Sequence, residues 1–216
     1  MAVPSSFYQF ITPYLSGVSE PLMDQEILRI ARDIAVRTHC ETITQRINSL
    51  VNTNNYALTP GSEREAVRLM DAYYNTTELE QVASPDISNP LALVGAIGAA
   101  SPVSQDPQAV FTDNPLTQIY VYPVPSTAVT QGITVRFTVR PTPASTTVPD
   151  ILLRYESVVA KGVIMNCLAI PGQPFSNTSA YMLYKMEYEN LLAAMRAEIA
   201  RGNSRSKRRV NPVRFM

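Results

Sequence analysis

The sequence contains few of the residues that catalytic and metal-binding sites require. It has one histidine, His39, and two cysteines, Cys40 and Cys167. A zinc site needs further ligands at characteristic spacings, and none accompanies His39. A Cys–His pair for nucleophilic catalysis must bring its side chains face to face, which adjacent helix residues do not do. We therefore expect no metal and no cofactor, and we interpret His39 as a helix-end residue that the dipole favours.

Catalytic sequence motifs are absent as well. The chain has no Gly-x-Ser-x-Gly, no phosphate-binding loop and no His-Glu-x-x-His. The acidic residues Glu78 and Glu80 lie near a predicted turn, where solvated charge is expected. The sequence therefore predicts a protein that is not an enzyme.

The sequence also lacks a long apolar run and a disulfide framework. The longest apolar stretch, residues 91–100, is too short to span a bilayer and is interrupted by glycines. Residues 1–15 have neither the basic start nor the apolar run of a signal peptide. The two distant cysteines are interpreted as small buried apolar residues. We expect a protein made in a reducing cytoplasm, without a membrane partner.

Charge is balanced overall but unevenly distributed. The formal net charge is zero, so no global field attracts the chain to nucleic acid or to membranes. No acidic residue follows Glu198, so the rest of the chain is net acidic. The basic residues beyond it are Arg201, Arg205, Lys207, Arg208, Arg209 and Arg214.

Residues 204–216 form a basic tail without a periodic apolar stripe, so they cannot bury themselves in a core. Three functions fit this pattern. The tail can bind nucleic acid by neutralising phosphates, insert into a partner protein with Val213 and Phe215 as anchors, or simply solubilise the chain. Phe215 is its single aromatic residue, which argues against base stacking.

Residues 149–170 predict a largely buried helix. After Pro149, apolar residues recur at steps of three and four as far as Ala169. Gly162 costs such a helix about 1 kcal/mol relative to alanine. We therefore expect Gly162 to mark a close backbone contact with a neighbouring element.

A second helix is expected over residues 177–201. Ser176 or Asn177 can cap its first turn, and Gly202 ends it. The short turn between the two helices makes them antiparallel neighbours. The residues expected to pack this hairpin are Tyr155, Gly162, Pro171, Gly172, Pro174, Phe175, Ala180 and Tyr184.

A further helix is expected over residues 22–40, before which the pattern is mixed. In residues 1–21, a short helical segment packed on a neighbour and a partly ordered arm both fit. The apolar stripe of the expected helix comprises Met23, Ile27, Ile30 and Ile34.

Between these helices the apolar period changes to two. The clearest pattern covers residues 133–139, where apolar residues alternate with polar ones. Arg136 and Arg140 lie on the opposite face, which is either solvated or a basic strip. Further strands are expected near residues 43–51, 56–58, 67–74, 79 and 119–121.

Residues 84–115 are rich in Pro, Ala, Ser, Gly and Asn and show no sustained period. They predict a long loop, mobile or at an interface, or else a hidden element, with room for a short helix over residues 89–97.

Several of these segments carry a family resemblance. Asp150-Ile151-Leu152, the run Ala160-Lys161-Gly162-Val163-Ile164-Met165 and the turn Pro171-Gly172-Gln173-Pro174-Phe175 resemble the C-terminal half of head-to-tail adaptor proteins of tailed bacteriophages. The helix ending Arg37-Thr38-His39-Cys40 and the strand, Pro-x-Pro, strand pattern before residue 141 are similar to that family too. The resemblance covers about residues 22–202 and is weakest over residues 84–115.

The resemblance implies an α+β fold with a helical core, residues 1–42 and 149–203, and an inserted antiparallel β domain, residues 43–148. It implies a structural protein of the virion neck, made in the host bacterial cytoplasm. About twelve copies would form a ring whose partners are the portal protein, a downstream tail or nozzle protein and the double-stranded DNA passing through the lumen. The alternative is a basic-tailed nucleic-acid-binding protein. The tail residues expected to dock on the portal are Arg205, Lys207, Arg208, Arg209, Val213, Arg214 and Phe215.

Overall fold

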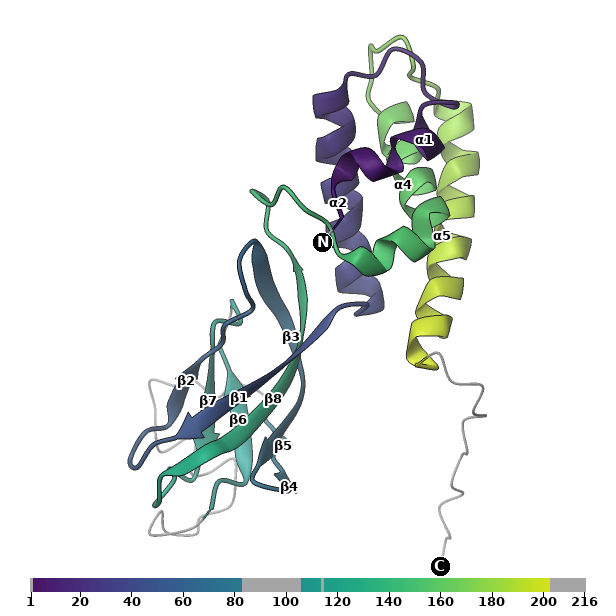
Figure 1. The fold of residues 1–216 in the computed structure, drawn as a ribbon. Helices are drawn as coiled ribbons and strands as arrows, with labels where there is room; N and C mark the ends of the chain where they lie inside the picture. Colours follow the sequence, from purple (N-terminus) through teal and green to yellow (C-terminus); the bar gives the residue numbers. More distant parts are fainter. Residues whose placement is uncertain (1, 83–105, 114, 203–216) are drawn as a thin grey trace, which may run out of the picture. The chain divides into compact units, whose positions relative to one another are not determined.

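The computed structural model describes residues 2–82, 106–113 and 115–202, and it confirms the α+β class (Figure 1). The chain divides into two compact units. One unit combines Met1–Cys40 with Thr146–Met216 and is helical. The other is Glu41–Ser145 and contains all the named strands of the described residues.

The helical unit is built around α4, which contacts α1, α2 and α5 (Figure 1). Buried residues occur all around α4, as expected for a helix that is covered on most sides. The elements of this unit are the 3₁₀ helices η1 (Pro4–Phe7) and η2 (Asp150–Tyr155) and the α-helices α1 (Tyr8–Ile11), α2 (Glu20–Thr38), α4 (Glu156–Leu168) and α5 (Thr178–Ala200).

Helix α2 follows its predicted pattern closely. The four residues of the expected stripe are all buried. His39 adopts a left-handed conformation with φ 54°, and its backbone N–H bonds to the carbonyl of Ala35. This geometry ends the helix and confirms the helix-end interpretation of His39.

Two predictions about neighbouring segments are resolved. The N-terminal residues form a short packed helical segment, in which Phe7 and Ile11 are fully buried. The single helix expected over residues 149–170 was wrong at its start, because η2 comes first and Tyr155 leaves the helical conformation with φ −122° and ψ 37°. A tighter 3₁₀ turn is common at helix ends, and apolar spacing alone does not distinguish the two.

The β unit contains two four-stranded sheets with the orders β1-β8-β3-β4 and β2-β7-β6-β5. All pairs are antiparallel except β5 with β6, a short parallel pair that the expected antiparallel domain did not include. The strands are β1 (Thr42–Ser49), β2 (Asn55–Ala57), β3 (Arg64–Tyr74), β4 (Thr77–Glu78), β5 (Glu80–Gln81), β6 (Ala109–Thr112), β7 (Gln118–Tyr122) and β8 (Val129–Pro141).

The sequence left open whether the two arginines of β8 lie on a solvated face or form a basic strip, and the structure distinguishes the two. Its apolar residues at 133, 135, 137 and 139 are fully buried in the hydrophobic core of the β unit. Arg136 pairs with Asp71 and Arg140 with Glu65, each at 2.5 Å and each directly across from its partner on β3. The polar face is therefore solvated and ion-paired rather than a basic strip.

Strand β6 lies within residues 84–115, so this segment is not one long loop but contains a hidden element, the alternative that the sequence left open. Ala109, Val110 and Phe111 are all buried, so this short strand shows no alternation of apolar and polar residues. The helix predicted over residues 89–97 lies outside the described residues.

Candidate interaction site on the helical unit

The hairpin turn places its residues as follows. Pro171, Gly172 and Pro174 are exposed, and Gly172 has φ +77°, a left-handed conformation that suits glycine. Phe175 is half-buried against the helical core. The side chain of Asn177 accepts a hydrogen bond from the Ala180 N–H at 3.0 Å, which caps the first turn of α5.

Gly162 lies where α4 passes between α2 and α5. A Cβ atom built at this position would lie 2.9 Å from two carbons of Ile30 and 2.9 Å from the ring of Tyr188. Real Cβ atoms do not approach other atoms so closely. A glycine therefore lets side chains of both neighbouring helices pack directly on the backbone of α4.

A polar cluster joins α2 to α5. The hydroxyl of Tyr188 donates to Asp33 at 2.7 Å, and Arg37 donates to Asp33 at 3.5 Å and to Glu189 at 2.9 Å. Burial, followed by the bond to Asp33, raises the pKa of Tyr188 above its ordinary range. The hydrogen bond from Arg37 lowers the pKa of Glu189. The cluster orients the C-terminal half of α5 against α2.

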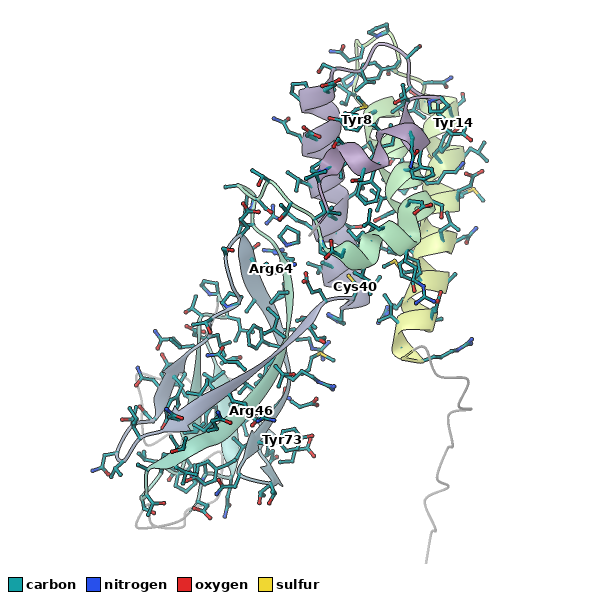
Figure 2. All side chains as sticks on the ribbon, in the orientation of Figure 1. Tyr8, Tyr14, Cys40, Arg46, Arg64 and Tyr73 are labelled. Atoms are coloured by element: carbon teal, nitrogen blue, oxygen red, sulfur yellow. The ribbon has the colours of Figure 1, made fainter. Side chains whose placement is uncertain are left out.

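A second cluster ties α5 to α4 and to the segment after α1. Lys161 pairs with Glu187 at 2.7 Å, and its ammonium lies 4.6 Å from the ring centroid of Tyr184 and 5.4 Å from that of Tyr14. The two rings meet edge to face, 6.5 Å apart, and Tyr14 is marked in Figure 2. Tyr184 is half-buried at this junction.

The 3₁₀ helix η2, just before α4, is held to the end of α5 in a similar way. Arg154 pairs with Glu198 at 3.1 Å and lies over the half-buried ring of Tyr155. Together with the two clusters, this contact engages every acidic residue of α5, namely Glu187, Glu189 and Glu198. The outward face of α5 is therefore left with apolar, basic and neutral polar side chains.

Large apolar side chains are exposed on that outward face. Met182, Leu183 and Met186 have exposed fractions of 56%, 57% and 65%, and we refer to them as the methionine patch. They lie opposite the buried residues Tyr188 and Leu192. Exposed apolar patches on well-packed helices commonly mark contact sites with other proteins.

A groove of about 600 Å³ runs along the C-terminal half of α5 beside the end of α2. Its charged residues are Arg37, Glu189, Arg196 and Arg201. Its apolar lining is Leu192, Ala193, Ala197 and Ala200. We refer to these eight residues as the arginine groove.

The structure places some of the predicted site residues and leaves others outside the residues it describes. The hairpin residues Tyr155, Gly162 and Tyr184 lie at helix contacts, whereas the tail residues expected to dock on the portal lie outside the described residues. Sequence reasoning missed both the methionine patch and the arginine groove. The signal for the patch was present, because α5 carries large apolar residues on two opposite faces.

No three His, Cys, Asp or Glu side chains in residues 2–82, 106–113 and 115–202 could hold a metal ion, and none of the helices in these ranges is long and apolar enough to cross a membrane. Neither cysteine forms a disulfide; Cys167 is buried as predicted, but Cys40 is only half-buried. Burial raises the pKa of the Cys167 thiol to about 11, so it stays protonated.

The whole chain was compared with known proteins. No curated protein matches it. A family model does match, with the description SU10 adaptor protein, over residues 13–214. This match spans both units, including the hairpin and the strands whose motifs resemble phage adaptors. The chain therefore belongs to the SU10 adaptor protein family of phage head–tail adaptors, which are structural components of the virion.

Proposed function

We propose that copies of this protein form a ring that joins the portal to the tail and encloses the channel through which double-stranded DNA passes. The methionine patch is the observation that carries this proposal. Each copy in a closed ring contacts two neighbours and needs surfaces that lose water on assembly. By analogy with the adaptor resemblance, the ring has about twelve copies.

The methionine patch suits a contact between copies because its support is rigid. Helix α5 is anchored by Tyr188 in the core and by ion pairs to three other elements. The backbone of such a helix needs no ordering when its three large apolar side chains are buried, so the entropy cost of the contact is confined to their rotamers and offsets only part of their burial free energy. Methionine side chains also adapt to an irregular partner surface.

The basic tail supplies a second contact in this proposal. Its five basic residues after Gly202 pair with acidic groups of the portal, while Val213 and Phe215 act as apolar anchors. Ordering a tail on binding costs conformational entropy, which reduces the net affinity of this contact. The opposite end of the ring contacts a downstream tail or nozzle protein. The protein is made in the host bacterial cytoplasm and ends in the neck of the virion.

Electron microscopy of the purified protein mixed with portal rings tests the proposal. The full-length chain is compared with a chain that ends at Gly202, after circular dichroism has established that both are folded. Rings stacked on the portal only with the full-length chain are expected. Stacking by both chains would keep the adaptor role but remove the tail from docking. No stacking by either would refute the portal contact.

The uneven charge distribution supports one alternative function, a nucleic-acid-binding protein with a basic tail. This alternative predicts that the free monomer binds duplex DNA with an affinity that falls steeply as the salt concentration rises. It also predicts that the chain ending at Gly202 does not bind duplex DNA. Such binding without any stacking on portal rings would favour this alternative over the adaptor ring.

A further inference from the structure

We propose that the arginine groove binds an acidic helical segment of a different protein of the virion. The inference rests on the proposed function only in placing this partner within the virion. The recognition itself follows from the shape and charge of the groove.

The shape of the groove fits a helix. Ala193, Ala197 and Ala200 follow one another at steps of four and three, so their small side chains form one row along α5. Helices pack by placing side-chain ridges of one into grooves of the other, with axes about 8–10 Å apart. A row of alanines beside Leu192 allows a partner helix to approach at the short end of that range. Recognition of a helix in an apolar groove is a recurring binding mode.

The charge of the groove specifies acidic side chains on that helix. Three arginines and one carboxylate line it, and Arg37 is paired with that carboxylate, Glu189, so recognition of an acidic partner falls chiefly to Arg196. Arg196 and Arg201 lie on the exposed end of α5. A guanidinium group binds a carboxylate through two parallel hydrogen bonds, which makes arginine well suited to an acidic partner.

The protein's own segments are poor occupants of this groove. The tail after Gly202 contains no acidic residue, so its charge is repelled by the arginines. In α2, the carboxylates of Asp24, Glu26 and Asp33 accept hydrogen bonds from Tyr8, Asn166 and Tyr188. In α5, all three carboxylates are in ion pairs. In α2 and α5, Glu20 is therefore the one acidic residue outside these contacts, so these two helices of a second copy offer no row of unengaged carboxylates one turn apart, and the partner is a different protein.

Fluorescence anisotropy with the full-length chain tests the inference. The probe is a labelled helical peptide of about 15 residues, with alanine and leucine on one face and glutamates flanking that face. The matched comparison peptide has lysines in place of the glutamates. Arg196→Glu reverses one charge in the groove, and Ala197→Gln fills its alanine row. Lys185→Glu and Ala194→Gln make the same chemical changes at exposed positions of α5 outside the groove.

The expected result is binding of the acidic peptide alone, weakened about tenfold or more by Arg196→Glu and by Ala197→Gln. The two control variants are expected to stay within about twofold of the unmodified chain. No binding of the acidic peptide, or equal binding by all four variants, would overturn the inference. Loss of duplex DNA binding in the two groove variants, without peptide binding, would assign the groove to nucleic acid instead.

The portal experiment separates this inference from the proposed function. If rings of the unmodified chain still stack on the portal while the acidic peptide fails to bind, the adaptor role stands and only the groove assignment falls. If the peptide binds as expected but no rings stack, the groove assignment stands and the portal contact falls.

Discussion

Single residues decide how closely the helices of the helical unit pack. Gly162→Ala is expected to lower the free energy of unfolding by about 1–3 kcal/mol, because the new Cβ would lie 2.9 Å from Ile30 and Tyr188. The intrinsic preference of alanine for a helix acts in the opposite direction by about 1 kcal/mol. Urea unfolding measures the balance. A variant more stable than the unmodified chain would show that α2 and α5 can move away from α4 without a loss of packing free energy.

Tyr188 predicts a dependence of stability on alkaline pH. Because its pKa is raised by burial and by Asp33, the folded protein retains the phenol proton above the ordinary pKa of 10.0, whereas the unfolded chain releases it. Its contribution to stability is therefore complete below pH 10 and is lost as the pH rises further.

The comparison of the unmodified chain with Tyr188→Phe isolates this effect from the other tyrosines. Urea unfolding at about pH 8 is expected to show the variant less stable by about 1 kcal/mol, the usual value of one hydrogen bond. At about pH 11 this difference is expected to shrink, because the unfolded chain is then ionised. A difference that stays constant across this range would contradict the raised pKa of the buried Tyr188.

For single residues, the sequence predicts where a special backbone conformation or close packing is needed better than it predicts which side chains bond to one another. A glycine inside an apolar helix indicates a close approach, and Gly162 lies at one. The bond from Tyr188 to Asp33 joins residues 155 positions apart, so it depends on how the helices pack and leaves no local pattern. The apolar residues of α5 that face solvent were missed because periodicity was used to find a single buried face.

At the scale of elements, the cap of α5 is the clearest local device. Asn177→Ala removes the acceptor for the Ala180 N–H and is expected to lower the free energy of unfolding by about 1 kcal/mol. Asn177→Asp keeps an acceptor at the same place and is the matched control, expected to lie near the unmodified chain. Equal losses in both variants would mean that the cap is not what stabilises this turn.

Elements with a strong period were predictable and short ones were not. The stripe of α2 and the alternation in β8 span several turns or residue pairs, so each pattern is distinct from its alternatives. Strands β5 and β6 have two and four residues, too few for a period, and β5 pairs in parallel with a strand far along the chain. The parallel pair depends on the packing of the whole β unit.

At the scale of the whole molecule, the methionine patch predicts self-association. Replacing Met182 and Met186 together by glutamate is expected to abolish rings in electron microscopy, because charged side chains would have to be buried between copies. The free energy of unfolding is expected to change by less than about 0.5 kcal/mol, since both residues are exposed. Leu153→Glu, an exposed apolar position on η2, serves as the control. Rings that persist in the double variant would remove the patch from the contact.

The family role was predictable because its motifs are local in sequence, as in the hairpin turn and the strands around Pro123. The surfaces on α5 were not, because they appear only when tertiary contacts engage its three carboxylates and leave Arg196 beside the alanine row. The numbers of acidic and basic residues along the chain do not show which of these side chains form ion pairs in the folded protein.

Electron cryo-microscopy of the complete virion neck tests the central claim most directly. The account predicts a closed ring of this protein between portal and tail, with α5 of each copy presenting Met182 and Met186 to the next copy and with DNA in the central channel. Absence of the protein from that junction, or its presence as separate copies without contacts between them, would contradict the account.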